Sequence, residues 1–284
     1  MKKFGLIALF FVTIIWGFGF IFVDIALNEI TPVQFMFFRF IVASLALIIC
    51  LNKKILSILS IELKCGTILG VILYISFYLQ TEGLNYSTPT KNAFLTSTYV
   101  VFVPILVYLF ERKRISRTKI FCVLLAILGS GLMVFDSTFR LGLGDTLTIA
   151  CAIAFALHIY LTTIYLRKCR VMMLVFTQMI VVTIIAFFFA LPQGIPTNLS
   201  KITIAMIALS GIMATALSYF IQTWAQQYIS ETTSALILSM ESVVGMVASV
   251  LILNETITTR MVLGAIIILI AVVCCEMKFK KRYD

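Results

Sequence analysis

The chain has 284 residues, of which 62% are hydrophobic and only 12% are charged, and its mean hydropathy is +1.12. A soluble globular protein of this size carries about twice that share of charged residues, so the composition excludes a soluble domain and indicates an integral membrane protein. The net charge of +10 does not indicate a nucleic-acid partner, because the basic residues lie mostly in short segments between apolar runs.

Ten apolar runs near the thickness of a bilayer follow one another along the chain. Runs of this length satisfy their backbone hydrogen bonds in lipid only as helices. The first run follows Met1, Lys2 and Lys3, as in a secretion signal, but it has no small-x-small cleavage site, so we interpret it as a retained membrane helix. The predicted helices are residues 4–23, 32–51, 66–85, 89–110, 118–135, 144–166, 171–191, 202–224, 231–253 and 258–276.

Short connections separate the runs, and two of them carry helix-start signals. Thr31-Pro32 and Thr88-Pro89 each place a capping hydroxyl before a proline at the first helical position. The longest connection, residues 52–64, mixes apolar and polar side chains, and this pattern predicts a short helix that lies on the membrane surface.

The cysteines and the histidine do not indicate metal or disulfide chemistry. The seven cysteines form no C-x-x-C pair, and most lie inside apolar runs, where a thiol behaves as a small hydrophobic group. The single histidine, His158, is too few for a histidine-rich metal site. We therefore expect neither a metal site nor a structural disulfide.

The 22 basic residues divide unequally between the two ends of the predicted helices. With the N-terminus inside the cell, 17 lie on the inner side, Arg39 lies within a helix, and four lie on the outer side: Lys91, Arg140, Lys201 and Arg260. This division obeys the positive-inside rule. It predicts a multi-pass protein of the cell inner (plasma) membrane with both termini cytoplasmic.

The stretch from Gln80 to Ile115 occurs twice in the chain. Shifted by 142 positions, it aligns without a gap with residues 222–257, and nine of 36 positions are identical, where this composition gives roughly one in twelve by chance. The offset is half the chain length, which indicates two tandem copies of one unit. We expect a five-helix repeat over residues 1–136, a second over residues 142–277 and a basic cytoplasmic tail over residues 278–284.

Five helices per repeat is an odd number, so the second repeat must cross the membrane in the opposite orientation to the first. Inverted repeats are typical of secondary transporters, in which one half rocks against the other and exposes a central site to each side in turn. Gly17, Gly19 and Pro104 are positions where such helices can bend. The predicted fold is an all-α integral membrane protein with ten transmembrane helices in two inverted-topology repeats.

Several short motifs occur in order along both halves. They are Trp16-Gly17, Arg39-Phe40, Gly83-Leu84-x-Tyr86, Ala93-Phe94, Val103-Pro104, Gln222-Thr223-x-Ala225-Gln226, Ser239-Met240-Glu241 and Asn254-Glu255-x-Ile257-Thr258. With this set the chain resembles the drug/metabolite transporter superfamily, in its ten-helix EamA branch, over nearly its whole length. The resemblance implies transport of small metabolites, often amino acids or related compounds and often outward, with no bound cofactor and no ATP.

Two departures from the family pattern fall where a substrate would lie. Glu241-Ser242 stands where the family often has Glu-Pro. The run from Phe155 to His158 stands where the family often has an aromatic residue followed by Ala-x-Tyr. The identity of the substrate is therefore the property that the resemblance transfers least well.

Glu241 is the main candidate for coupling transport to a cation. It lies about ten residues into its predicted helix, near the middle of the membrane at ~1.5 Å per residue. A charge at that depth usually faces a cavity or a partner. Its repeat mate Tyr99 lies at the same depth, with Ser239 nearby. We hypothesise that Glu241 binds a cation or carries protons; a purely structural carboxylate is the alternative.

Arg39 and Glu82 lie at similar depths in neighbouring helices that run in opposite directions. An ion pair between them would stabilise both charges inside the membrane. The sequence therefore predicts this ion pair, with binding of a substrate carboxylate by Arg39 as the alternative.

Further polar and aromatic residues are candidates for the lining of a transport pathway. Gln80 and Gln222 are repeat mates, and amides both donate and accept, which suits a zwitterionic or polyhydroxylated substrate; they also suit contacts between helices. His158 is a candidate for substrate binding or proton relay, and packing is its alternative. Trp16 and Trp224 are candidates for an aromatic lining that holds organic cations.

We therefore expect a secondary active transporter, not an enzyme, that exports small polar or amphipathic metabolites by alternating access, with proton coupling as a hypothesis. A proton-independent facilitator or importer stays open within this class. From other classes, a non-transporting receptor and a membrane-embedded enzyme stay open, although no paired acidic motif or metal-ligand spacing favours an enzyme. The expected partners are a small-molecule substrate, protons and the lipid bilayer, without nucleic acid, and a homodimer is left open.

Overall fold

The computed structural model describes residues 1–112, 115–134 and 142–280, and within these residues every regular element is a helix. The all-helical prediction is therefore confirmed for this part of the chain. Three predicted features lie outside the described residues: the end of the first repeat at 135–136, Arg140 with part of the basic cluster at 113–114, and residues 281–284 of the basic tail.

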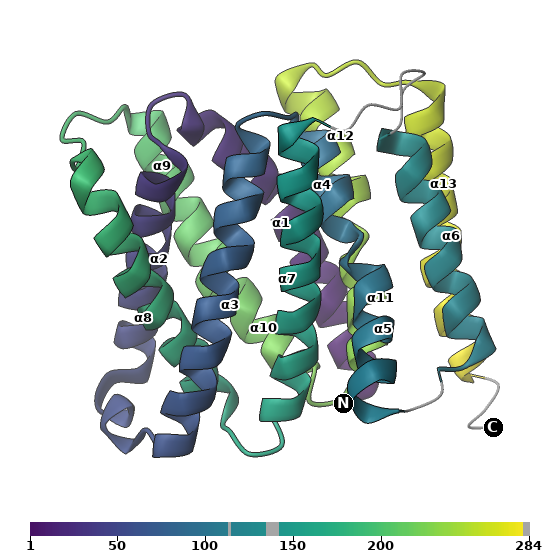
Figure 1. Ribbon diagram of the computed structural model, residues 1–284, viewed down its shortest axis with the longest axis horizontal. Helices are drawn as coiled ribbons and strands as arrows, with labels where there is room; N and C mark the ends of the chain where they lie inside the picture. The colour runs from purple at the N-terminus through teal and green to yellow at the C-terminus, as the bar shows by residue number, and fades with distance from the viewer. Residues whose placement is uncertain (113–114, 135–141, 281–284) are drawn as a thin grey trace.

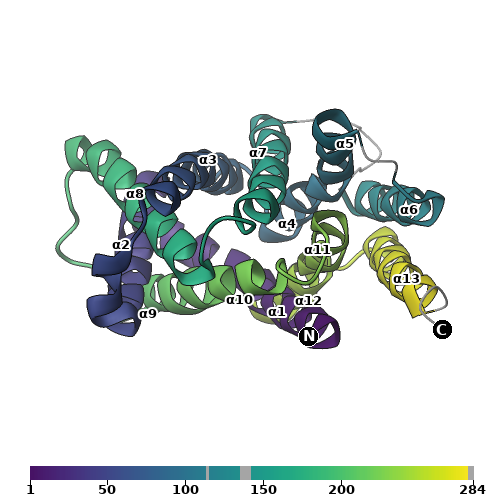
Figure 2. The ribbon, with the colours of Figure 1, turned by 90° about the horizontal axis from the view of Figure 1, so that it is seen from below.

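Eight helical spans of the described chain are long and apolar enough to cross a membrane. They are α1 (Lys2–Leu27), α2 (Pro32–Leu51), α3 (Ser60–Leu84), α4 with α5 (Pro89–Ser97 and Tyr99–Glu111), α7 (Leu143–Tyr165), α8 with the short η2 (Val171–Ala190 and Leu191–Gln193), α9 to α10 (Lys201–Gly211, η3 at Ile212–Leu217, Ser218–Ala225) and α11 with α12 (Glu231–Leu238 and Glu241–Leu253). Two other long helices, α6 (Arg117–Val134) and α13 (Thr259–Lys280), pack against each other beside the main bundle (Figure 2).

Local chemistry explains where α2 and α4 begin. The Thr31 hydroxyl accepts a hydrogen bond from the Gln34 amide, and the Gln34 side chain accepts one from the Thr31 amide. Thr88 caps α4 in the same way through the Lys91 amide. In both helices a proline follows the cap, where its missing N–H costs nothing.

The connection after α2 differs from the expected surface helix over residues 52–64. A 3-10 turn covers Asn52–Ser57, and α3 already begins at Ser60, six residues before the predicted start. The extension is stable because Glu62 in its first turn is fully buried and bonded to Arg170. The hydropathy pattern placed Glu62 in a loop, because hydropathy does not show the contact with Arg170.

Two membrane helices are interrupted at positions that are 142 residues apart. The first interruption lies at Thr98, between α4 and α5, and the second at Ser239 and Met240, between α11 and α12. The hydroxyls of Ser97 and Ser239 each donate to the carbonyl three residues earlier, at 2.8 Å, and so compete with the helical hydrogen bond at that turn. The sequence predicted a bend at Pro104, but this residue lies inside α5 and the helix is interrupted six residues earlier, at Thr98.

The packing of the helices repeats when the two halves are exchanged. α1 packs against α10 and α12, while its counterpart α7 packs against α3 and α5. The counterparts α2 and α8 pack against each other, as do α6 and α13. In Figure 1, α1 rises from the N-terminus at the lower end, whereas α7 begins at the upper end and continues into α8 at the lower end. Corresponding helices therefore run in opposite directions.

Candidate functional site

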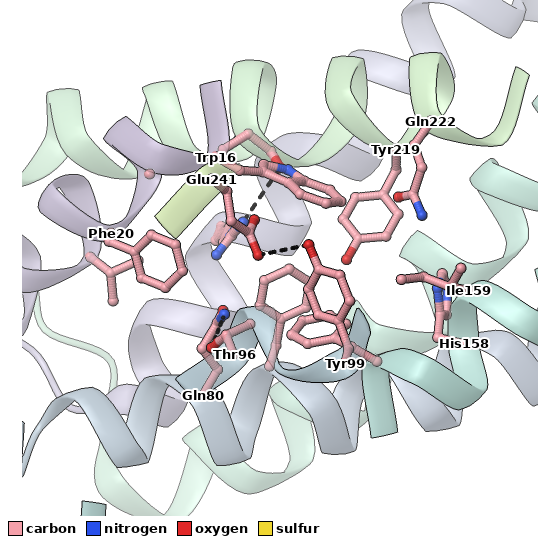
Figure 3. A pocket seen from close by; sticks show the side chains of 16 residues that line it. Trp16, Phe20, Gln80, Thr96, Tyr99, His158, Ile159, Tyr219, Gln222 and Glu241 are labelled. Carbon is pink, nitrogen blue, oxygen red and sulfur yellow. Dashed lines mark hydrogen bonds between the residues drawn. The ribbon is translucent and has the colours of Figure 1, made fainter. Parts of the chain in front are cut away.

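A pocket of about 520 Å³ lies in the middle of the bundle, beside the two helix interruptions. Helices α1, α2, α3, α7 and α10 and both interrupted helices contribute to its wall. It is lined by Trp16, Gly19, Phe20, Val23, Arg39, Phe77, Gln80, Thr96, Tyr99, Phe155, His158, Ile159, Ala214, Tyr219, Gln222 and Glu241. In Figure 3, Glu241 and Tyr99 meet in the middle of the pocket, with Gln80 and Thr96 on one side and His158 and Gln222 on the other.

Glu241 and Tyr99 are the first residues after the two interruptions, at the beginning of α12 and α5. Their side chains are only 3% and 2% exposed, and the Tyr99 hydroxyl donates a hydrogen bond of 3.1 Å to Glu241 Oε1. Within the described chain, no ion pair to Glu241 is present. A buried carboxylate without a cationic partner favours the binding of a proton or of a cationic ligand group.

Arg39 reaches the same pocket from α2. Its Nε donates to Thr215 Oγ1 at 2.6 Å, its Nη2 lies 3.5 Å from the Ala214 carbonyl oxygen, and its guanidinium carbon lies 4.3 Å from the centre of the Phe77 ring. The side chain is 4% exposed. The pocket therefore contains one buried cation and one buried carboxylate that come from opposite halves of the chain.

The predicted ion pair between Arg39 and Glu82 is not formed, because Glu82 lies on another face of α3. That helix turns Phe77 and Gln80 toward the pocket. Glu82 follows Gln80 by two positions, which is about 200° around an α-helix. The prediction compared only the depth of the two residues in the membrane, and depth does not specify the face on which a residue lies.

The two repeat-matched glutamines have different partners. Gln80 Nε2 donates to Thr96 Oγ1 at 3.2 Å, whereas Gln222 Nε2 donates to Gln226 Oε1 at 3.2 Å. Gln222 Oε1 is buried and has no donor among the described residues. This oxygen is therefore an acceptor that is available to a donor group of a ligand.

His158 lies at the same end of the pocket as Gln222 (Figure 3). Its side chain is 1% exposed, and its Nε2 is 2.7 Å from Gln178 Oε1. The ring packs at a right angle to Tyr219, with the two ring centres 5.7 Å apart. The contact with Gln178 orients the imidazole at the pocket wall.

Aromatic rings form much of the remaining wall. Trp16 lies against Tyr219 at a centroid distance of 5.3 Å and donates its indole N–H to the Ala214 carbonyl at 2.8 Å. Phe77 and Phe155 meet edge to face at 5.2 Å. Sequence reasoning missed Phe77, although its spacing of three residues from Gln80 places it on the same helical face.

Two further predicted residues lie away from the pocket lining. Ser239 donates its hydroxyl to the Leu236 carbonyl at the interruption. Trp224 is half-buried and packs against Tyr228 with ring centres 5.5 Å apart. The structure thus brings together Glu241, Tyr99, Gln80, Gln222, His158, Trp16 and Arg39, and it places Ser239, Trp224 and Glu82 elsewhere.

Comparison with known proteins adds independent information. The chain matches the EamA-like transporter family over residues 3–135 and again over residues 142–275. It is 31% identical over 267 residues to an uncharacterized transporter of Archaeoglobus fulgidus, which covers 94% of this chain and 84% of that protein. It is 22% identical over 293 residues to the uncharacterized transporter YoaV of Bacillus subtilis, covering 95% and 96% of the two chains.

A solved crystal structure is similar over 100% of both chains, with a TM-score of 0.81 and 9% sequence identity. At that level of identity the likeness shows the fold alone.

Proposed function

The chain belongs to the EamA-like transporter family, within the drug/metabolite transporter superfamily, and we propose that it is a secondary active transporter that exports small metabolites such as amino acids. Membership in the family indicates a membrane transporter. The substrate class, the direction and the coupling are our proposal.

The observation that carries the proposal is the pair of buried, opposite charges that share one pocket without an ion-pair partner in the described chain. Arg39 and Glu241 are 4% and 3% exposed. A buried charge without a counter-charge is costly, so the site favours a ligand that supplies one. A ligand with a carboxylate for Arg39 and an ammonium group for Glu241 compensates both charges, while its apolar part contacts the aromatic wall.

Glu241 also provides a route to proton coupling. One buried carboxylate binds either a proton or the ammonium group of a ligand, because the two cations compete for the same oxygen atoms. A proton that enters from one side would therefore release the ligand to that side. Exchange of this kind moves a proton inward for each ligand that moves outward.

Alternating access is supported by the symmetry of the fold. We infer that α6 and α13 cross the membrane together with the eight apolar spans, which makes ten transmembrane helices in two inverted five-helix repeats. The interruptions at Thr98 and Met240 lie 142 residues apart, at equivalent positions of the two proposed repeats. Paired interruptions beside a central site are where inverted-repeat transporters bend.

The test uses purified protein in liposomes loaded with each of the twenty proteinogenic L-amino acids in turn. Efflux is measured with and without a proton gradient directed into the liposomes. We expect the gradient to accelerate the efflux of the transported amino acid in wild-type protein. Glu241→Gln should abolish this acceleration, whereas the control Glu82→Gln, outside the pocket lining, should keep it.

Each other outcome contradicts a different part of the proposal. Gradient-independent efflux by the wild type would indicate a facilitator, and acceleration that persists in Glu241→Gln would reject this residue as the coupling group. The absence of efflux for all twenty compounds would reject amino acids as the substrate class.

A further inference from the structure

The span from α9 to α10 contains a widened turn that its counterpart in the first repeat lacks. Within the described chain, Ile212–Leu217 is the one π-helical segment. The equivalent residues of the first repeat, 70–75, lie inside the uninterrupted helix α3. The repeat fold therefore does not require the wide turn, and π-helical turns are frequent at functional sites.

Two hydroxyl groups stabilise the wide turn. Thr215 Oγ1 donates to the Ser210 carbonyl and Ser218 Oγ donates to the Met213 carbonyl, both at 2.8 Å and both five residues earlier in the chain. Thr215 has a second role that Ser218 lacks, because Thr215 Oγ1 also accepts a hydrogen bond of 2.6 Å from Arg39 Nε.

The wide turn thus holds the guanidinium group of Arg39 by one edge. Nε binds Thr215 and Nη2 lies 3.5 Å from the Ala214 carbonyl oxygen, while Phe77 covers one face of the group. The remaining edge, formed by Nη1 and Nη2, has the geometry to bind a carboxylate through two parallel hydrogen bonds. When the two repeats are exchanged, Leu73 of α3 and Val181 of α8 occupy the positions equivalent to Thr215 and Arg39, and neither can form such a contact.

We propose that Thr215, held in place by the π-helical turn, is the positioning residue that aims Arg39 at the carboxylate of the transported ligand. The inference rests on the proposed function, since it assumes that Arg39 binds an anionic group. Thr215 has no direct contact with the ligand, and it determines the preference for a carboxylate over a carboxamide group through Arg39.

The experiment compares binding by three variants made in a Trp224→Phe background, in which Trp16 at the pocket is the remaining tryptophan of the two in the chain. Thr215→Val removes the hydroxyl and keeps the shape, Thr215→Ser keeps the hydroxyl, and Ser218→Ala removes the other hydroxyl of the same turn. The probes are the twenty proteinogenic L-amino acids and the amide of each one that binds, followed by Trp16 fluorescence.

We expect Thr215→Val to weaken binding of the amino acid by roughly ten- to a hundredfold and to leave binding of its amide unchanged, because a hydrogen bond to a charged group is lost. The affinities of Thr215→Ser and Ser218→Ala for the amino acid should stay within about threefold of that of the starting protein. An equal loss in Ser218→Ala would overturn the inference, because it would assign the effect to the turn itself. An unchanged preference for the acid in Thr215→Val would overturn it as well.

Two further arms separate this inference from the proposed function. If Arg39→Gln keeps the preference for the acid over the amide, the role of Arg39 in the proposed function is rejected. The second arm needs no ligand. It measures the NMR resonance of the Arg39 Nε–H group in protein labelled with ¹⁵N-arginine, and the loss of this resonance in Arg39→Lys assigns it. The resonance should shift in Thr215→Val but not in Ser218→Ala. A resonance that does not shift in Thr215→Val rejects the positioning role even if no amino acid binds.

Discussion

Glu62 illustrates how one partner stabilises a carboxylate inside an apolar helix. Its two oxygen atoms accept 2.7 Å hydrogen bonds from Nε and Nη2 of Arg170, and the backbone amides of Leu59 and Arg170 complete the set at 2.9 and 3.0 Å. The carboxylate is fully buried, while the arginine side chain is about half-exposed. Because Arg170 is the residue immediately before α8, this contact joins the two halves of the protein at one end of the bundle.

Replacing this carboxylate tests its contribution to stability. Glu62→Gln leaves one of the paired donors of Arg170 without an acceptor, and we expect the free energy of unfolding to fall by about 1–3 kcal/mol. The measurement is thermal unfolding of the purified protein in detergent micelles. The control is Glu29→Gln, since Glu29 is exposed and accepts a 2.9 Å hydrogen bond from the Ser200 amide. An equal fall in the midpoint temperature of unfolding for the two variants would contradict the prediction.

At the scale of the elements, glycines determine how closely helices of the two halves approach. Gly83 of α3 and Gly144 of α7 face each other: a β-carbon at Gly83 would lie 2.9 Å from the Gly144 carbonyl oxygen, and one at Gly144 would lie 2.6 Å from the Gly83 carbonyl oxygen. Small residues at such crossings allow backbones to come together in lipid, where apolar contacts alone give no preference for protein over lipid tails.

A matched pair of substitutions checks this close approach. In Gly83→Ala the new methyl group would lie 2.5 Å from Thr148 Oγ1, so we expect a loss of about 1–3 kcal/mol in stability from overpacking. In Gly19→Ala the nearest atom is the Ala214 β-carbon at 3.6 Å, and better helix propensity should add about 0.5–1 kcal/mol. In micelles, the midpoint temperature of thermal unfolding should therefore fall in Gly83→Ala and rise in Gly19→Ala. A stabilised Gly83→Ala would show that α3 and α7 have room to separate.

At the scale of the whole molecule, the ends of the helices differ in charge. The N-terminus, the turn after α2 and the turn after α7 lie at the lower end of the bundle in Figure 1, and they contain Lys2, Lys53 and Lys168. The turns after α1 and α8 lie at the upper end. From the positive-inside rule we propose that the lower end faces the cytoplasm.

Cysteine labelling in intact cells tests this orientation. In a background without the seven native cysteines, Asn28→Cys and Asn198→Cys should react with a membrane-impermeant maleimide added outside. Lys53→Cys and Lys168→Cys should react only after the cells are permeabilised. All four positions are exposed, so access to the reagent depends on the membrane alone. The reverse pattern would invert the proposed topology.

The lower end also contains a bridge between α10 and α7, and the proposed alternating access predicts that this bridge opens during transport. Gln226 at the end of α10 donates to the Ile159 carbonyl at 3.0 Å and to Thr163 Oγ1 at 3.1 Å, both in α7. Joining Thr163→Cys and Gln226→Cys with a short cleavable thiol cross-linker should stop efflux from liposomes, and cleaving the linker should restore it. Efflux that continues after complete cross-linking would show that this end does not open during transport.

Part of this fold follows from the chain read in order. Bilayer-length apolar runs require helices wherever they occur, and the caps at Thr31 and Thr88 locate two helix starts from four residues each. The spacing of 142 makes Tyr99 and Glu241 repeat mates before any coordinates are known, and the structure places them 3.1 Å apart at the pocket. Properties that depend on composition, local hydrogen bonding and periodicity can be determined from the sequence alone.

Only the tertiary structure decided which faces meet. The partners of Arg39 and the early start of α3 both depend on side chains that are distant in the sequence. Hydropathy also does not indicate the interruption at Thr98 in place of Pro104, or the position of Trp224 away from the pocket lining. The π-helical turn after Gly211 likewise has no signal in hydropathy, because hydroxyl groups and a distant arginine stabilise it. The energy of a buried polar contact depends on both partners, and a one-dimensional pattern contains only one of them at a time.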